Sequence, residues 1–213
     1  MNPITTDTSK SLKELGFTEK SIVETILVTI NVDGTFNAAP MGILIHNDVL
    51  ETRPFYTSRT YKNLNTQKKA TINIISNPYL FLATAFKNEV DQQPRIRNMI
   101  IEGSEAVIRV EKISKSKFSD LKASFLLKPL EIEIINQKPH VFSRGRAEAI
   151  EAVIHATRIK VFHKKDKREE VTKLLEKLDN CIKVINSVSG KDSTEMLVVE
   201  RIKEMIEHWR IIQ

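Results

Sequence analysis

The sequence contains a single cysteine, Cys181, so the chain cannot form an internal disulfide. It has neither paired cysteines nor an H-E-x-x-H pattern, and we therefore expect no metal site. No run of 18 apolar residues occurs, which argues against a membrane-spanning helix and a membrane partner. Residues 1–20 are polar and mixed in charge and lack the apolar centre of a signal peptide, so we expect a cytoplasmic location.

The sequence also lacks a concentration of basic residues when it is counted in two parts, although its formal net charge is +6. Residues 1–140 contain 18 Lys and Arg against 15 Asp and Glu, and residues 141–213 contain 15 against 12. The densest cluster, residues 164–168, lies at a predicted turn between helices and is interrupted by Asp166. We therefore expect a solvated loop there and no nucleic-acid partner, and the excess charge would suit a small anionic ligand.

The pattern that is present is a series of short segments in which apolar and polar residues alternate, as in half-buried antiparallel strands. Asp33-Gly34 is typical of a tight hairpin, and residues 46–48 form a second turn. The predicted strands span residues 23–31, 36–45, 49–55, 70–76, 105–112 and 130–136. Short helices are expected at 9–15, 57–67 and 79–86, a mobile loop at 87–98, and a polar excursion at 114–128.

From Ser143 onward the apolar residues recur with the period of a helix. Asp166 with Glu169, and Asp192 with Glu195, have the spacing of capping boxes that open a second and a third helix. Six short strands followed by helices predict a mainly β fold with additional α structure, a small antiparallel barrel over residues 1–142 with a C-terminal three-helix subdomain over 143–213.

The stretch richest in chemistry is the turn Thr57-Ser58-Arg59-Thr60, which lies between a predicted strand and a predicted helix. A first helical turn has unpaired N–H groups and a dipole that favours an anion. The three hydroxyls and a guanidinium, either Arg53 or Arg59, would add hydrogen-bond donors, so this turn predicts a phosphate site. The simpler alternatives are a plain helix N-cap at Ser58 or Thr60 and ordinary surface charge at both arginines.

A second group of candidate residues, Ala39-Pro40-Met41-Gly42, interrupts the predicted second strand. Proline cannot donate to a strand ladder and marks an edge or a bulge, whereas Gly42 permits a ligand to approach the backbone closely. The four residues suggest an exposed ledge, and a bulged edge strand without a ligand explains them equally well. A small barrel fills its interior with side chains, so a ligand must lie outside it or at a dimer interface.

Taken in order, A-P-M-G, R-P-F-Y-T-S-R-T-Y-K-N-L, the strand that carries Asn73, and E-A-V-I-H-A-T-R resemble an archaeal family of unknown function. That family has the FMN-binding split-barrel fold of flavin reductases and pyridoxamine-phosphate-oxidase-like proteins. The resemblance covers residues 20–163 and implies a split barrel that binds FMN as a homodimer, with the flavin near the subunit interface. It matches Ser58 and Thr60 to phosphate-binding hydroxyls, residues 40–42 to the segment beside the flavin ring, and Asn73 to an asparagine of the strand after the helix.

The function that this resemblance implies is a flavin-dependent oxidoreductase, which moves hydride or electrons between a small-molecule reductant and an unknown acceptor. The backbone at Met41 and Gly42 and the Asn73 amide would contact the pyrimidine edge of the flavin. No histidine motif for nicotinamide binding is recognisable, so the cofactor is better supported than a reaction, and no catalytic residue is assigned. A flavin-storage or flavin-sensing protein, and a relative that binds a deazaflavin or pyridoxal phosphate, are the alternatives.

His155 and Arg158 lie three residues apart on the first C-terminal helix and could face the same site. If they reach the flavin, His155 would donate a proton and Arg158 would bind an anion, whereas a structural polar pair is the alternative. On the first interpretation the C-terminal helices cover the flavin site.

Overall fold

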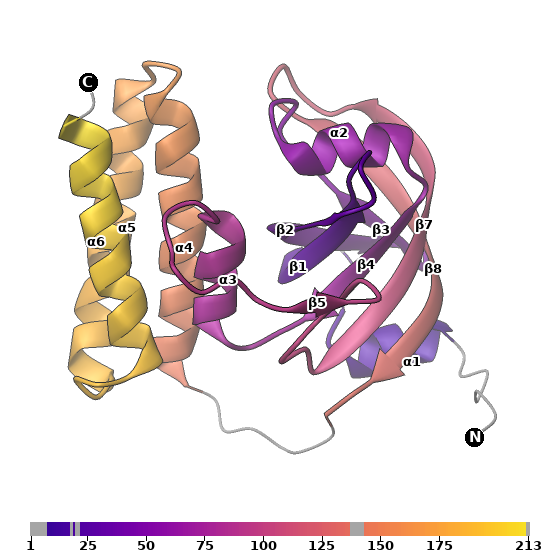
Figure 1. Cartoon of the computed structure of the whole chain (residues 1–213), viewed down its shortest axis with the longest axis horizontal. Coiled ribbons are helices and arrows are strands. Elements are labelled where there is room, and N and C mark those ends of the chain that lie inside the picture. Colours follow the sequence, from indigo (N-terminus) through magenta and orange to yellow (C-terminus); the bar gives the residue numbers. More distant parts are fainter. Residues whose placement is uncertain (1–7, 18, 20–21, 137–142, 212–213) are drawn as a thin grey trace. The chain divides into compact units, whose positions relative to one another are not determined.

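The computed structural model describes residues 8–17, 19, 22–136 and 143–211. These residues form two compact units (Figure 1). One unit comprises the described residues up to 75 together with 95–136, and the other comprises 76–94 together with 143–211. The predicted domain boundary after residue 142 stays a prediction. The two compact units are divided differently, because residues 76–94 belong to the same unit as the C-terminal helices.

The first unit is a closed antiparallel barrel in which the strands follow the order β1-β2-β3-β8-β7-β4 (Figure 1). The strands are β1 (Ile22–Ile30), β2 (Phe36–His46), β3 (Val49–Thr52), β4 (Lys69–Ile74), β7 (Ala106–Lys117) and β8 (Ala123–Ile134). Pairing of β1 with β4, from Ile26 opposite Asn73 to Thr29 opposite Ala70, closes the barrel. The predicted antiparallel barrel of six strands is confirmed.

Local chemistry sets the turns that join the first strands. The Asp33 carboxylate accepts hydrogen bonds from the backbone N–H and the hydroxyl of Thr35, at 3.0 and 2.6 Å, and Gly34 between them adopts a φ of 82°. The turn from β2 to β3 places Asn47 and Asp48 at φ values of 49° and 62°. Asn and Asp tolerate this left-handed region better than other residues with side chains, so both predicted turns are confirmed.

Large apolar side chains from every strand fill the barrel. One from each strand in chain order is Leu27, Ile43, Leu50, Ile72, Ile108 and Phe125. Two helices add to this core, since α1 (Thr8–Glu14) contributes Leu12 and α2 (Arg59–Thr66) contributes Leu64, both fully buried. Because side chains occupy the interior, a ligand-binding surface of this unit has to lie outside the barrel.

Two segments that the sequence predicts as irregular form strands instead. Residues 114–128 are not a polar excursion, because β7 and β8 pair along nearly their whole length, from Ala106 opposite Ile134 to Lys117 opposite Ala123. Residues 96–101, partly within the predicted loop, form a separate hairpin of β5 (Ile96–Arg97) and β6 (Ile100–Ile101). The outer part of β7 is exposed on both faces, so its sequence lacks the apolar alternation that marks a strand.

The second unit consists of α3 (Pro78–Ala85), α4 (Arg144–His163), α5 (Arg168–Val188) and α6 (Thr194–Ile211). The three predicted C-terminal helices are confirmed, and α4 packs against each of the other three helices. Both predicted capping boxes are wrong: the residue before α5 is Lys167, which makes no side-chain cap, and Ser193 rather than Asp192 accepts the Met196 N–H. Among the described residues, no helix has the length and apolarity needed to cross a bilayer.

Candidate functional site

The predicted ledge lies on β2, and all four of its residues are partly exposed. On one side this part of β2 pairs with β1, with Pro40 opposite Ile26, while β3 pairs only from Ile43 onward. Pro40 therefore lies where the strand has a single neighbour, which is the edge that its missing N–H predicts. The ledge carbonyls are partly engaged, since Met41 accepts the Thr25 hydroxyl at 3.1 Å.

Packing explains why position 42 is a glycine, which the sequence did not suggest. A Cβ atom at this position would lie 2.8 Å from Cγ2 of Ile22 on the neighbouring strand β1. The space beside the Gly42 backbone is thus occupied by a side chain of the protein itself. The predicted contact of Gly42 with a ligand stays a prediction, and the need for glycine there is explained without it.

The hydroxyl-rich turn lies at the start of α2, as predicted, with Ser58 as the N-cap. The Ser58 hydroxyl accepts the Tyr61 N–H at 3.1 Å and donates to the Phe55 carbonyl at 2.8 Å, so it is committed to the turn. The N–H groups of Arg59 and Thr60 precede that of Tyr61 and have no acceptor within the helix. Their unpaired donors make this turn a place where an anion can bind.

The side chains of the turn divide into exposed and buried groups. Thr57 and Arg59 are exposed, so both can reach a ligand. Thr60 is only 2% exposed, and its hydroxyl accepts the Asn37 side-chain amide at 3.3 Å. A bound phosphate would therefore meet Thr57, Arg59 and the backbone of the turn first, while Ser58 and Thr60 shape it.

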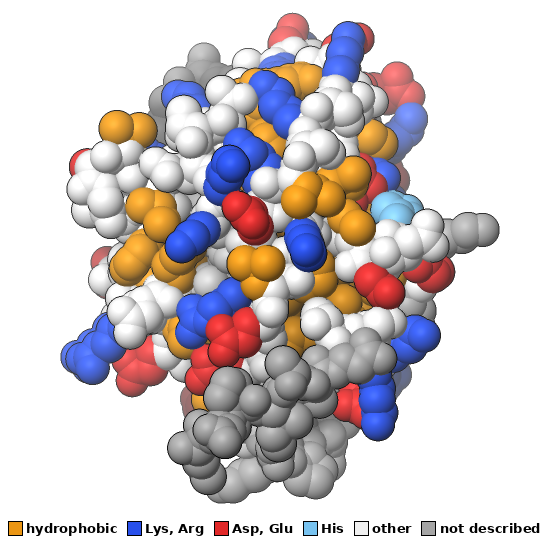
Figure 2. All heavy atoms as spheres, turned by 90° about the vertical axis from the view of Figure 1, so that its right-hand side faces the viewer, with side chains coloured by type: hydrophobic (Ala, Val, Ile, Leu, Met, Phe, Trp, Pro, Cys, Tyr) orange, Lys and Arg blue, Asp and Glu red, His pale blue; other side chains and the backbone are white. Residues whose placement is uncertain are grey.

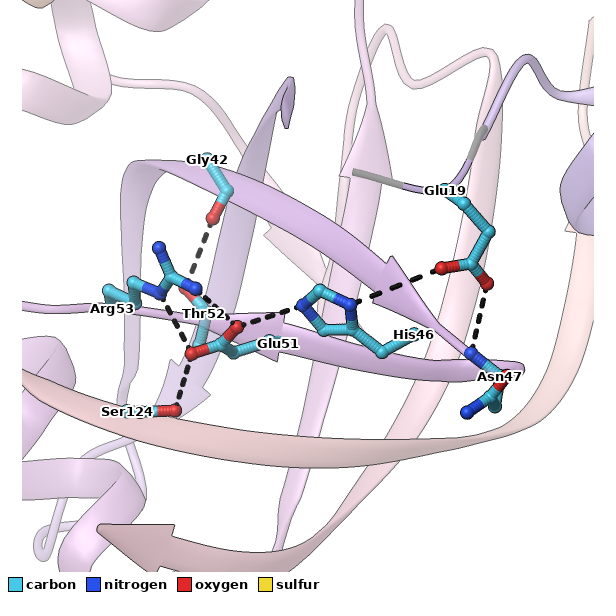
Figure 3. A network of polar contacts seen from close by, with 8 residues as sticks. All are labelled: Glu19, Gly42, His46, Asn47, Glu51, Thr52, Arg53 and Ser124. Atoms are coloured by element: carbon cyan, nitrogen blue, oxygen red, sulfur yellow. Dashed lines mark hydrogen bonds and ion pairs between the residues drawn. The ribbon is translucent and has the colours of Figure 1, made fainter. Parts of the chain in front are cut away.

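Arg53 follows β3 directly and is held rigidly (Figure 3). Its Nε and Nη2 each donate to a different oxygen of Glu51, both at 2.7 Å. The guanidinium also lies over the Phe118 ring, 4.1 Å from its centroid. The third nitrogen, Nη1, points away from Glu51 in Figure 3, so the arginine keeps one donor group for an anion.

Glu51 is the centre of this network and is 6% exposed. Besides Arg53 it accepts the Ser124 hydroxyl at 2.6 Å, and His46 Nε2 lies 3.2 Å from its other oxygen. The hydrogen bonds from Arg53 are the main reason that the pKa of Glu51 falls to about 2, against the opposing effect of burial. The same pairing raises the pKa of Arg53, so both groups stay charged at neutral pH.

Asn73 is fully buried, and its amide is taken up by protein partners. Its oxygen accepts the Ile101 N–H and the Ser104 hydroxyl, both at 3.0 Å, and its nitrogen lies 3.4 Å from the Met99 carbonyl oxygen. Asn73 thereby fastens the β5–β6 hairpin to β4. A direct contact between Asn73 and a flavin stays a prediction, whereas its role in positioning this hairpin is visible.

His155 and Arg158 lie on α4 in the helical unit. The His155 side chain is buried, with Nε2 3.3 Å from a Glu151 oxygen and Nδ1 without a hydrogen-bond partner among the described residues. Burial lowers the pKa of His155, Glu151 opposes this shift, and the positive charge of Arg158 adds to it. Their contact with a flavin stays a prediction, and the pairing with Glu151 favours the structural alternative for His155.

Sequence reasoning missed Glu51, Ser124 and Phe118, which together fix Arg53. Glu51 and Arg53 alternate with Thr52 and so point to the same side of β3, which was a usable signal. No signal linked them to Ser124, since that contact needs the pairing of β3 with β8. Among the described residues, no group of His, Cys, Asp and Glu side chains is arranged to bind a metal ion.

Comparison with known proteins places the chain in a family. A solved structure of an FMN-bound family member from Methanosarcina mazei is 24% identical, covers 91% of this chain and 98% of its own, and superimposes with a TM-score of 0.70. Its likeness confirms the split-barrel fold with C-terminal helices that the sequence predicts. No curated protein matches the chain.

More distant structures include the flavin reductase of styrene monooxygenase from Pseudomonas putida S12, with 12% identity, 53% of this chain and 79% of its own covered, and a TM-score of 0.45. A putative oxidoreductase from Sinorhizobium meliloti 1021 is 11% identical, with 70% of this chain and 57% of its own chain covered and a TM-score of 0.45. The family model of the N-terminal domain of a protein of unknown function, DUF447, matches residues 23–136, and the chain therefore belongs to this family.

Proposed function

We propose that this protein binds FMN on the outer surface of the barrel and acts as a flavin-dependent oxidoreductase. The observation that carries the proposal is the start of α2, where the N–H groups of Arg59 and Thr60 have no acceptor within the helix and the side chains of Thr57 and Arg59 are exposed. A dianionic phosphate fits such a turn. The FMN bound by the Methanosarcina mazei family member supports the same cofactor here.

Different residues of this chain would bind the phosphate and the ring of the cofactor. Thr57, Arg59 and the turn backbone would bind the phosphate, and Nη1 of Arg53 would add a donor whose direction Glu51 fixes. The half-exposed edge of β2 at Pro40 and Met41 would lie beside the ring. When bound, the flavin would supply hydride and electron transfer with a small-molecule reductant, and the protein would orient it and tune it by local charge.

A comparison of FMN with riboflavin tests the phosphate site. We expect Thr57→Ala and Arg59→Ala each to weaken FMN binding about 10- to 150-fold, because hydrogen bonds to a charged group contribute about 1.5–3 kcal/mol. Riboflavin binding should change little. Thr66→Ala, at the other end of α2 where the hydroxyl bonds only to helix carbonyls, is the matched control.

Titrations followed by flavin fluorescence would give both affinities. A wild-type protein that binds FMN and riboflavin equally well would refute the phosphate site. Reductant oxidation by the FMN-loaded protein, measured with nicotinamide dinucleotides, would then test the oxidoreductase assignment separately, and negligible turnover with every reductant would favour flavin storage or sensing.

The proposal includes a homodimer with the flavin near the subunit interface. Leu130 and Ile134 of β8 and the following Ile135 are 51, 44 and 47% exposed, so this short segment presents three large aliphatic side chains to solvent. We expect Leu130→Glu with Ile134→Glu to convert a dimer into a monomer in analytical ultracentrifugation and to weaken FMN binding. A wild-type monomer that binds FMN at full strength would contradict this part of the proposal.

A further inference from the structure

The fold brings together two basic stretches of the chain. Residues 53–69 contain five Lys and Arg and no acidic residue, and residues 111–122 contain four against two. These 29 residues have an excess of seven positive charges, whereas the other 184 residues contain 24 Lys and Arg against 25 Asp and Glu. The expectation that basic residues are spread evenly is therefore wrong, because counts along the sequence do not register which stretches meet in the fold.

Direct contacts join α2 to the β7–β8 hairpin. Lys112 Nζ donates to the Leu64 carbonyl at 2.6 Å, and Lys115 Nζ lies 3.1 Å from the Tyr61 hydroxyl oxygen. The pKa of Lys112 is lowered, first by burial and then by repulsion from Lys115 and Lys68. Like charges are thus close enough to repel one another.

We call this region the basic surface. It consists of the exposed residues Arg59, Lys62, Lys68, Lys69, Lys115 and Lys117 and the partly buried Arg53, Lys112 and Lys122. Figure 2 shows a face of the molecule on which Lys and Arg side chains lie among hydrophobic ones and fewer Asp and Glu side chains. Lys117 pairs with Asp120 at 2.6 Å and Arg53 with Glu51, but basic residues remain in excess on this surface. An excess of like charge destabilises the compact state, so a partner of opposite charge would offset part of this repulsion.

Two apolar side chains stand within the basic surface. Ile113 on β7 and Phe118 at the hairpin end are 52 and 50% exposed, and one face of Phe118 is covered by Arg53. Aromatic and aliphatic anchors surrounded by charged residues are the anatomy of a protein–protein interface. A loop that only contacts solvent would not require two large exposed apolar side chains.

Two other aromatic rings beside the basic surface each have a lysine over one face, which leaves less ring surface for stacking with nucleic-acid bases. Lys115 lies 5.1 Å from the centroid of the Tyr61 ring and Lys122 lies 4.5 Å from that of Phe55. Single-stranded nucleic acid is bound by stacking on open ring faces. The surface also has seven lysines and only two arginines, although arginine is the residue best suited to phosphate recognition.

We propose that the basic surface is a docking site for an acidic protein, with Ile113 and Phe118 as its apolar anchors. Hydrated lysines would steer the partner to the surface over long range, and the two apolar side chains would then be buried. A second copy of this chain cannot dock surface to surface, because both would carry the same charge. Arg59 belongs both to the basic surface and to the α2 turn, so the docked protein would lie beside the proposed phosphate site.

The test uses a small acidic [2Fe–2S] ferredoxin as the protein probe, with a 20-base-pair DNA duplex and phosphatidylserine-containing vesicles as rival anions. The variant is Lys62→Glu/Lys68→Glu/Lys117→Glu in the full chain. Its control, Lys173→Glu/Lys191→Glu/Lys203→Glu, makes the same change in net charge on exposed positions of the helical unit. FMN affinity, measured first on every variant, shows whether the proposed cofactor site is intact and so separates its failure from failure of the docking proposal.

We expect salt-dependent binding of the ferredoxin to wild type, a loss of about tenfold or more in the surface variant, and little change in the control. Phe118→Ala should weaken ferredoxin binding without changing its salt dependence, since it removes an anchor and no charge. Two results would overturn the proposal. One is equal binding of ferredoxin to the surface variant and its control, and the other is tighter binding of duplex DNA or vesicles that responds to the surface variant but not to Phe118→Ala.

Discussion

Protonation of Glu51 should remove a measurable part of the stability of the barrel. The folded pKa of about 2 lies below the ordinary value of 4.5. Each tenfold change in proton affinity corresponds to about 1.4 kcal/mol, so the ionised carboxylate stabilises the fold by about 3 kcal/mol. Because the folded pKa is depressed, this stabilisation is fully present above the unfolded value of 4.5 and is lost as the pH falls through about 2.

The substitution Glu51→Gln should reproduce this loss at neutral pH. Glutamine keeps the shape, but it leaves the half-buried Arg53 without a charged partner, and we expect a cost of about 2–4 kcal/mol at pH 7. The difference between wild type and variant should then shrink as the pH falls from 5 toward 2, because the unfolded wild-type chain protonates Glu51 in this range while the folded chain keeps it ionised. Glu131→Gln is the control, since it breaks an exposed pair with Arg109 and should cost less than about 1 kcal/mol.

Urea unfolding of the FMN-free protein at several pH values would measure these free energies. The barrel needs its own probe, because the only tryptophan, Trp209, belongs to the helical unit. Hydrogen exchange of peptides from β2 and β3 provides one. A stability difference between wild type and Glu51→Gln that stays constant from pH 7 to pH 3 would refute the assignment of the lowered pKa to this ion-pair network.

Three further predictions concern packing, polar positioning and pH. Gly42→Ala should destabilise the barrel by about 1 kcal/mol through its clash with Ile22, and Ile22→Ala should relieve most of that loss in urea unfolding of the double variant. Asn73→Ala should cost about 2–5 kcal/mol and speed hydrogen exchange in β6, because the Ile101 N–H and the Ser104 hydroxyl lose their buried acceptor. Burial lowers the folded pKa of His155 below its ordinary value of 6.5, so stability that is present above pH 6.5 is lost as the pH falls through the folded pKa. The substitution His155→Gln should flatten this pH dependence in unfolding followed by Trp209 fluorescence.

The sequence was sufficient for the parts of the fold that depend on neighbouring residues. Asp33-Gly34 and Asn47-Asp48 determine their turns through local hydrogen bonds and left-handed backbone, and alternation located most of the barrel strands. The position of Ser58 at the start of α2 was equally local. Capping boxes failed as a guide at α5 because their spacing can occur without the geometry, as at Lys167.

Features that depend on barrel closure could not be predicted in the same way. Ser124 reaches Glu51 only after β8 has paired with β3, and the basic surface exists only after the β7–β8 hairpin has packed on α2. The hydrogen bond between the Asn73 amide and the Ile101 N–H of the β5–β6 hairpin could not be predicted for the same reason. Each of these links residues that are distant in the sequence, where periodicity and motif spacing carry no information.

The membership of α3 in the helical unit has a consequence for how the chain is made. Residues 76–94 interrupt the barrel sequence, so β4 leaves the ribosome before α3 and its partner β7 leaves after it. The barrel can close only across this insertion, while Phe81 and Leu82 of α3 and the following Phe86 are buried only after α4 to α6, which are synthesised later. Neither unit is therefore a continuous piece of chain, and a fragment that ends before α4 would leave these three apolar side chains without the helices that bury them.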